Sequence, residues 1–280
     1  MILLKTSQDG DLHVRNTAAS PTVYLDHWGL RRFSENEGLA TRLTTALEAR
    51  GGTLALSWAN LAEFSKGTSD EQTRKAECLI EANIPRLFFL EVDPFVVIDR
   101  ENKLLAGGQP SPPHGDQAFL RAFVTLKPSS PKQLTAHGLF LPVRNQAQDH
   151  LNKLADTFVD RVHALRTDFE NDSEFRSLVN HTKTYGIQRG TRFILSELVR
   201  ALMIDKKTKM TRNDAMDFFH TVVPVAYCEV VLLDKRWETL IERVRLRLEQ
   251  AGASIPIATV FSGKEKTNGV DRFLNMLESG

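Results

Sequence analysis

Acidic side chains lie at or just after three short apolar segments of this sequence. Asp26 ends the segment TVYLD, Asp234 ends EVVLLD, and Glu63 follows TLALS within the segment SWANLAEF. In an open parallel sheet, ligands bind beyond the carboxyl ends of the strands. Carboxylates that meet there repel one another, which raises their pKa values unless a cation neutralises them. Oxygen ligands of this kind suit Mg²⁺ or Mn²⁺.

Two more carboxylates lie in the segment TRNDAMDFFH, shortly before the apolar run that ends in Asp234. Asp214, Asp217 and Thr221 recur at spacings of three and four residues, so they share one face of a predicted helix. We expect this face to point away from the buried side, which an apolar stripe of Met216, Phe219 and Val223 forms. The predicted site for one or two divalent ions contains Asp26, Glu63, Asp214, Asp217 and Asp234.

Each of these acids also has a purely structural interpretation. A single Asp at the end of a strand is often a turn or cap residue. Asp214 lies three residues after Thr211 and can be its partner in a capping box. Glu63 alone can be an exposed helix residue, and His220 is expected to pack or hydrogen-bond rather than to bind a metal. The conjunction of acids at strand-to-helix positions favours a site over these separate roles.

The elements that must position the acids alternate between strands and helices. Apolar segments predict strands at 22–26, 53–57, 87–92, 229–233 and 257–260. Helical spacing predicts helices at 35–50, 58–64, 70–83, 212–224, 236–250 and 271–277. Ser57 is expected to cap the second helix, and Gly51 and Gly52 to end the first. This alternation predicts an α/β fold whose mainly parallel sheet is covered on both faces, in three layers.

The middle of the chain has a different pattern. Residues 107–116 and 127–132 are rich in Pro, Gly and Ser and predict loops, whereas 146–182 and 191–205 predict mostly helix. We therefore expect an α/β domain made of residues 1–100 and 211–280, interrupted by a mostly helical insertion at 101–210. The insertion is expected to affect substrate choice or self-association more than chemistry.

Composition excludes several classes of protein. The 280 residues are 41% hydrophobic and 25% charged, with a formal net charge of +1, which is typical of a globular chain. The longest apolar run, 222–233, is too short to cross a membrane, so no membrane association is expected. Cys78 and Cys228 form no metal-binding motif and suit a reducing compartment, so we expect a cytoplasmic protein.

These acids and their surroundings resemble PIN-domain proteins over about 22–100 and 211–262. The most specific stretch is NDAMDFFHTVVPVAYCEVVLLDKRW, in which an acid begins a helix and an apolar strand ends in Asp-Lys-Arg-Trp. PIN domains are metal-dependent nucleases with a Rossmann-like sheet, and many of them cut RNA, often as toxins. The resemblance implies that Asp26, Glu63, Asp217 and Asp234 are the metal-site acids, with Asp214 as a supplement.

The implied chemistry is hydrolysis of a phosphodiester bond, in RNA in preference to DNA, with Mg²⁺ or Mn²⁺ as cofactor. A bound metal activates a water for attack on phosphorus, and a second metal can stabilise the leaving oxygen. Neighbouring basic side chains are candidates for holding substrate phosphates: Arg31, Arg32, Lys235 and Arg236. Trp28 or Trp237 can stack on a base or pack in the core. A homodimer and a cognate inhibitor protein are further partners consistent with the resemblance.

Other functions fit the sequence less well. A dehalogenase-type phosphatase needs a second Asp two residues after the first, where this chain has Trp28. A dinucleotide-binding turn needs more glycines than Gly29 alone, and no GxSxG elbow of a serine hydrolase is present. The alternative that stays open is a PIN-like scaffold that binds RNA or a protein partner without cutting.

Overall fold

The computed structural model describes most of the chain. The described residues are 1–6, 12–67, 70–107, 112–125, 135–181, 190–205, 208–252, 254–263 and 268–279. The predicted loop at 127–132 and residues 108–111 of the other predicted loop lie outside this part of the chain.

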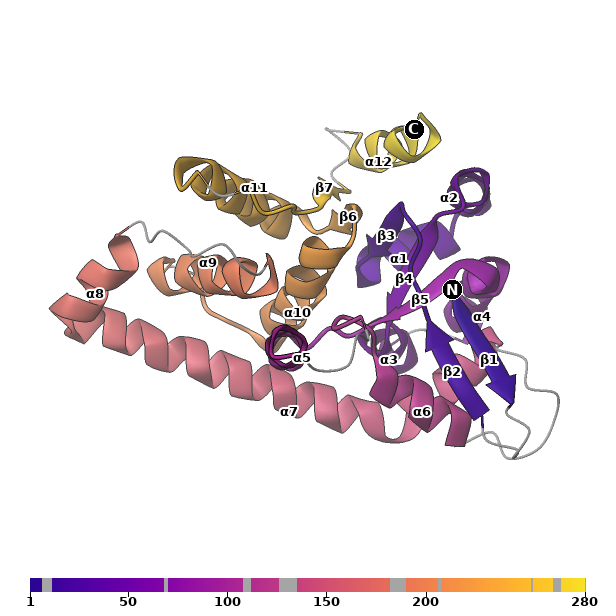
Figure 1. Ribbon diagram of the computed structural model, residues 1–280, viewed down its shortest axis with the longest axis horizontal. Helices are drawn as coiled ribbons and strands as arrows, with labels where there is room; N and C mark the ends of the chain where they lie inside the picture. Colours follow the sequence, from indigo (N-terminus) through magenta and orange to yellow (C-terminus); the bar gives the residue numbers. More distant parts are fainter. Residues whose placement is uncertain are drawn as a thin grey trace.

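Five parallel strands form the central sheet, as the sequence predicted. In spatial order they are β5 (Leu87–Leu90), β4 (Thr53–Ser57), β3 (Thr22–Leu25), β6 (Val230–Leu233) and β7 (Thr259–Ser262). Almost every residue in these strands is buried, because helices flank the sheet (Figure 1). Near-continuous apolar strands of this kind are typical of parallel sheets.

The order of the strands creates a switch point between β3 and β6. From β3 the chain adds β4 and then β5 on one side, and it later adds β6 and β7 on the other side. The connections that leave β3 and β6 therefore diverge, and the carboxyl ends of these two strands are where ligands bind in open α/β sheets. Backbone pairing holds the two ends in register, with Leu25 opposite Leu232. Asp26 and Asp234 come directly after these two strands.

Helices connect the strands and flank the sheet. The predicted helices are confirmed as α2 (Glu37–Arg50), α3 (Trp58–Gly67), α4 (Asp70–Asn83), α10 (Arg212–Tyr227), α11 (Lys235–Gln250) and α12 (Gly269–Glu278). Gly51 ends α2 with a φ of 61°, a conformation that glycine adopts without strain. Ser57 accepts a hydrogen bond from the backbone N–H of Asn60 at 3.3 Å, which confirms its capping role.

Two features of the amino-terminal region were not predicted. A separate helix, α1 (His27–Ser34), precedes α2, and Asn36 caps α2 by accepting from the backbone N–H of Leu39 at 3.0 Å. An antiparallel hairpin is formed by β1 (Ile2–Thr6) and β2 (Leu12–Asn16). The side chain of Asn16 donates to the carbonyl oxygen of Phe89 at 2.7 Å and accepts from its N–H at 3.0 Å. One buried amide thereby fastens the hairpin to β5.

The middle of the chain is mostly helical in its described residues. It contains the last turns of α5 (Pro94–Leu105), then α6 (Gln117–Thr125), α7 (Ala136–Asn171), α8 (Ser173–Asn180) and α9 (Gly190–Ile204). Figure 1 shows α7 as a long helix with α8 at its far end. The helix α7 packs against α3, α10 and α9, and its residues Leu151, Phe158 and Val162 belong to the same hydrophobic core as the sheet.

Candidate functional site

Asp26 lies at the end of β3 and caps α1. Its Oδ1 accepts a hydrogen bond from the backbone N–H of Gly29 at 2.9 Å, and the residue is buried. A Cβ on Gly29 would come within 3.3 Å of Asp26 Oδ1 and 3.2 Å of the Leu232 side chain, so glycine permits this close approach. Burial raises the pKa of Asp26 well above its usual value, and the charges of Asp217, Glu63 and Asp234 raise it further.

Asp234 repeats this arrangement on the neighbouring strand. It follows β6, caps α11 and accepts from the backbone N–H of Arg236 through Oδ1 at 2.9 Å. Unlike Asp26, Asp234 is exposed. In Asp26 and in Asp234, one carboxylate oxygen caps the following helix by accepting from a backbone N–H. Within the described residues, no side chain or backbone group donates a hydrogen bond to the other oxygen.

Asp217 lies on α10, in the helix that leads into β6. It is half-buried, and its pKa is raised to about 6. Burial is the main cause, and the charges of Asp234 and Glu63 add to it while His220 opposes it. A carboxyl with this pKa remains partly protonated near neutral pH, which is the behaviour expected of an acid placed among other acids without a cation.

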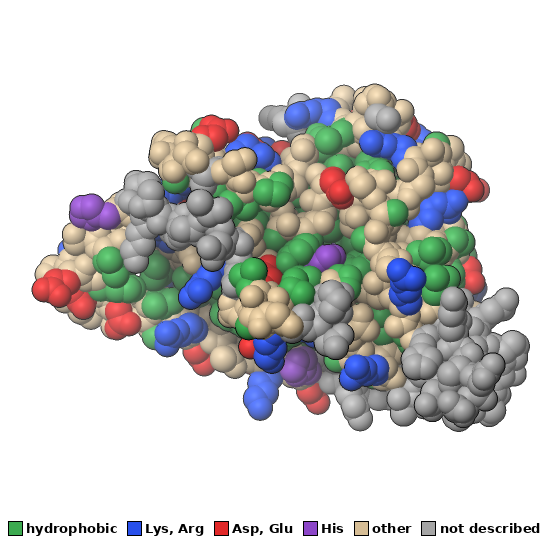
Figure 2. Space-filling model, in the orientation of Figure 1, with side chains coloured by type: hydrophobic (Ala, Val, Ile, Leu, Met, Phe, Trp, Pro, Cys, Tyr) green, Lys and Arg blue, Asp and Glu red, His purple; other side chains and the backbone are tan. Residues whose placement is uncertain are grey.

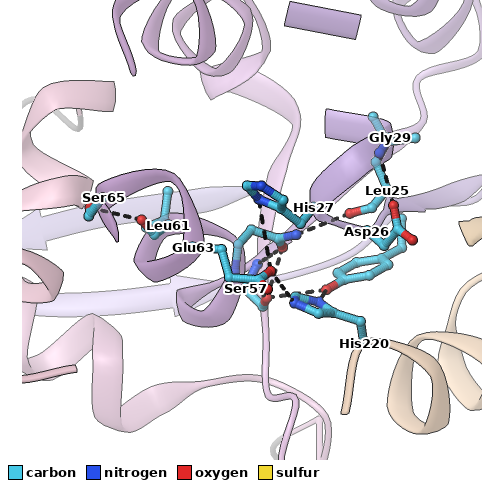
Figure 3. A network of polar contacts seen from close by, with 11 residues as sticks. Leu25, Asp26, His27, Gly29, Ser57, Leu61, Glu63, Ser65 and His220 are labelled. Carbon is cyan, nitrogen blue, oxygen red and sulfur yellow. Dashed lines mark hydrogen bonds and ion pairs between the residues drawn. The ribbon is translucent and has the colours of Figure 1, made fainter. Parts of the chain in front are cut away.

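Glu63 lies on α3 and faces two imidazoles. Its Oε2 is 2.8 Å from Nε2 of His220 and 3.9 Å from Nδ1 of His27 (Figure 3). The glutamate is partly buried, with a quarter of its side chain exposed, whereas His220 is fully buried. Burial lowers the pKa of His27, so this ring is neutral at physiological pH. The expectation that His220 is a hydrogen-bonding residue is confirmed.

Four acids from separate elements therefore lie close enough for their charges to act on one another. The charges of Glu63, Asp217 and Asp234 all raise the pKa of Asp26, and those of Glu63 and Asp234 raise the pKa of Asp217. In these side-chain positions, no three His, Cys, Asp or Glu residues in the described part of the chain form a group that could hold a metal ion. The donors are nevertheless hard carboxylate oxygens, which are the ligands that Mg²⁺ and Mn²⁺ prefer.

Asp214, the fifth predicted ligand, has structural partners for both of its oxygens. Its Oδ2 accepts from the backbone N–H of Thr211 at 2.8 Å and from the Thr211 hydroxyl at 2.6 Å. Its Oδ1 pairs with the guanidinium of Arg236. The capping box expected at Thr211 is thus confirmed. A metal at Asp214 would have to displace one of these contacts.

Most of the basic side chains predicted to hold phosphates are paired inside the chain. Arg31 Nε is 2.9 Å from Glu35, Lys235 pairs with Glu238, and Arg236 pairs with Asp214, while Arg32 is exposed. On the face seen in Figure 2, the Lys and Arg side chains are scattered singly among Asp and Glu. A polyanion would therefore compete with ion pairs that already exist.

One expectation about side-chain orientation needs correction, and one alternative that the sequence left open is decided. Thr221 was expected to share an outward face with Asp214 and Asp217, but it is fully buried and donates to the backbone oxygen of Asp217 at 2.7 Å. Its hydroxyl is satisfied by its own helix, so burial costs little. Trp237 is only 1% exposed and lies in the core, which excludes stacking on a base in this conformation.

The sequence did not reveal the polar residues that surround Glu63. Tyr24 and Ser57 lie inside buried strand segments, Asn60 lies one turn before Glu63, and all three are buried. The sequence marked Ser57 as a helix cap, but it gave no signal for the contact of Tyr24 with His220 or for the role of Asn60. His27 also lacked a pattern of its own, since it simply follows Asp26.

Comparison with known proteins gave no family assignment. No protein-family model, no curated protein and no solved structure matches this chain. Among the described residues, no helix has the length and apolar character needed to cross a membrane.

Proposed function

We propose that this protein is a PIN-like, metal-dependent nuclease that hydrolyses phosphodiester bonds, in RNA in preference to DNA. The observation that carries the proposal is that four acids lie near the switch point of a parallel sheet, close enough for Glu63, Asp217 and Asp234 to act on the charge of Asp26 and for Glu63 and Asp234 to act on that of Asp217. Ligands of open α/β sheets bind at this position. The same residues carry the resemblance to PIN domains.

The chain's own residues have distinct parts in this chemistry. Asp26 and Asp234 would each offer the oxygen that is not used for helix capping, and Asp217 would offer its carboxylate once it is ionised. Glu63 would complete the acidic shell or orient a water. A bound Mg²⁺ or Mn²⁺ would supply positive charge and lower the pKa of a coordinated water. Its charge would also offset the burial and the repulsion that raise the pKa of Asp217 to about 6.

The proposal extends to the organisation of the chain. Residues 101–210 are a helical insertion between the two parts of a PIN-like domain, and the strands and acids lie on either side of it in the sequence. Because α7 packs on both α3 and α10, the insertion supports the helices that carry Glu63 and Asp217.

The test is cleavage of labelled RNA and single-stranded DNA with Mn²⁺, Mg²⁺ or EDTA. Wild-type protein is expected to cut with metal and not with EDTA. Asp26→Asn and Asp234→Asn are expected to lose at least about 100-fold in turnover while they keep the wild-type circular dichroism spectrum. Asp99→Asn is the matched control, because Asp99 is an exposed acid on α5 that pairs only with Lys103.

The outcomes separate the two candidate functions. Metal-dependent cleavage that disappears in Asp26→Asn and persists in Asp99→Asn supports the nuclease. Cleavage that survives in folded Asp26→Asn and Asp234→Asn contradicts it. Binding of RNA without cleavage in any metal would instead identify the scaffold alternative.

A further inference from the structure

A chain of buried polar groups runs from Glu63 to the end of β3. Nε2 of His220 lies 2.8 Å from Glu63 Oε2, and its Nδ1 is hydrogen-bonded to the hydroxyl of Tyr24. That hydroxyl lies 3.3 Å from Ser57 Oγ. Ser57 donates to Asn60 Oδ1 at 2.8 Å, and Asn60 donates through Nδ2 to the carbonyl oxygen of Leu25 at 3.2 Å. Figure 3 shows this network beside Asp26.

The network joins the three elements that carry the inner acids. His220 lies one turn after Asp217 on α10, Glu63 lies on α3, and Leu25 immediately precedes Asp26. Tyr24, Ser57, Asn60 and His220 are all nearly inaccessible to water, so their hydrogen bonds have no competing solvent. A change at His220 is therefore felt at Glu63 through direct contact.

The protons in this network can be assigned from the donors and acceptors. The Ser57 hydroxyl gives its proton to Asn60 Oδ1. The Tyr24 hydroxyl lies against Nδ1 of His220 and can donate to it. A carboxylate can only accept a hydrogen bond, so Nε2 of His220 carries a hydrogen and donates it to Glu63.

We propose that His220 is a positioning residue, which holds the Glu63 carboxylate in place by a hydrogen bond from Nε2 and is itself fixed by Tyr24. The inference rests on the proposed metal-dependent function. The Glu63 carboxylate is then held at a defined position relative to Asp26 and Asp217. Partners that orient metal ligands typically affect metal affinity or activity by about 10- to 100-fold.

The test compares His220→Gln with His220→Leu. Glutamine keeps an N–H donor at nearly the reach of Nε2, whereas leucine removes the donor and retains much of the side-chain volume. We expect His220→Leu to weaken Mn²⁺ affinity, measured by calorimetry, by about 10- to 100-fold. The Mn²⁺ affinity of His220→Gln should stay within about threefold of the wild-type value, because the glutamine amide replaces the lost N–H donor. The loss should appear in turnover more than in KM for RNA.

A matched control removes a partly buried hydroxyl elsewhere. Tyr227→Phe deletes a hydrogen bond of 2.6 Å to Glu101 on α5 and should leave Mn²⁺ affinity unchanged. Tyr24→Phe frees Nδ1 of His220 and should give a smaller loss than His220→Leu. In the metal-free wild type, nitrogen NMR of His220 should show the Nε2–H tautomer. This measurement does not depend on any variant folding.

The results distinguish this inference from the function on which it rests. A wild-type protein that neither binds Mn²⁺ nor cleaves RNA would overturn both. Three results would overturn the role of His220 alone. The first is wild-type Mn²⁺ affinity in folded His220→Leu, and the second is an equal loss of Mn²⁺ affinity in folded His220→Gln and His220→Leu. The third is an Nδ1–H tautomer of His220.

Discussion

At the scale of single residues, Asp217 shows the conflict between stability and a charged site. Folding places this carboxyl in a half-buried position near Asp234 and Glu63, and its pKa rises to about 6. An acid whose pKa is raised by folding destabilises the folded protein at neutral pH, because it is ionised there in surroundings that favour its protonated form. A cation would remove this cost, which explains why such a residue can be retained at a metal site.

Asp217→Asn should therefore stabilise the metal-free protein and abolish its response to metal. At pH 7.5 we expect a gain of about 1–2 kcal/mol in the free energy of unfolding, allowing for partial exposure of the group. Addition of Mn²⁺ should raise the melting temperature of the wild type and leave that of Asp217→Asn unchanged. Urea unfolding with and without Mn²⁺ measures both effects. Equal responses to Mn²⁺ in the two proteins would contradict a metal role for Asp217.

The residues of the site were predictable to different degrees. Asp26 and Asp234 could be predicted, because a strand followed by a capping acid has a local sequence signature. His220 could be expected to hydrogen-bond, but its partners Glu63 and Tyr24 lie 157 and 196 residues away in the sequence. No periodic pattern reports such contacts. The ion pair between Arg236 and Asp214 was missed for the same reason.

At the scale of elements, α7 holds together the helices that carry the site. Phe158 of α7 stacks on Phe218 of α10 with ring centroids 4.2 Å apart, and it also lies near Phe219. On α3, Trp58 contacts the ring of His150 from α7 at 5.5 Å. The helix α7 thus fixes α3 and α10 relative to each other, and with them Glu63 and Asp217.

Phe158→Ala should destabilise the protein and reduce activity. Removing a buried phenylalanine leaves a cavity that costs about 3–5 kcal/mol, and Phe158 is only 5% exposed. Because the cavity adjoins α10, we expect a lower turnover even below the melting temperature. Leu178→Ala on α8 is the control, since Leu178 is 52% exposed and should cost less than about 0.5 kcal/mol. Equal melting temperatures for Phe158→Ala and wild type would contradict the supporting role of α7.

Local signals were sufficient for most elements but not for the hairpin. The capping box of α10 and the glycine end of α2 are short-range patterns, and they appear where the sequence placed them. The hairpin of β1 and β2 is fastened to β5 by Asn16, whose amide pairs with the backbone of Phe89. A two-stranded hairpin is marginal on its own, so it needs contacts with the rest of the protein, and the sequence does not display them.

At the scale of the whole molecule, a single hydrophobic core contains residues from the middle segment, 101–210, and from the parts of the chain before and after it. Leu139, Phe140, Ala155 and Leu198 belong to the same cluster as the strands. The α/β architecture was predictable because strand and helix periodicities are local. The sharing of one core was not predictable, because loop-rich composition at 107–116 resembles a domain boundary.

Replacing residues 135–205 with a short linker should therefore prevent folding. The deletion would expose the apolar surfaces of α3 and α10 that α7 now covers. We expect no cooperative unfolding transition in calorimetry and strong binding of a hydrophobic dye. A deletion protein that melts cooperatively would show that the segment is an independent module. Substrate choice is better tested by surface changes on α8 than by removal.

The pH dependence of metal-induced stabilisation tests the site in the intact molecule. Asp217, with a pKa raised to about 6, holds a proton in the folded state between about pH 4 and 6 that the unfolded chain has lost. Its contribution to metal-free stability therefore falls as pH rises through this window. Burial also raises the pKa of Glu91 to about 7, which acts in the same direction, and lowers that of His114 to about 4, which acts in the opposite direction.

The contributions of Glu91 and His114 cancel when stability with Mn²⁺ is compared with stability without it at the same pH. Metal binding requires ionised carboxylates, so the Mn²⁺-induced stabilisation should grow as pH rises through about 6, opposite to the metal-free contribution of Asp217. At a Mn²⁺ concentration of about 100 times Kd, it should reach about 2.7 kcal/mol at pH 7.5. Unfolding in urea at pH 5.0, 6.0 and 7.5 measures this difference. Because the increase in Mn²⁺-induced stabilisation with pH comes from the buried acids, it should vanish in Asp26→Asn and persist in Asp99→Asn. A stabilisation that is equal at all three pH values would mean that the metal binds elsewhere.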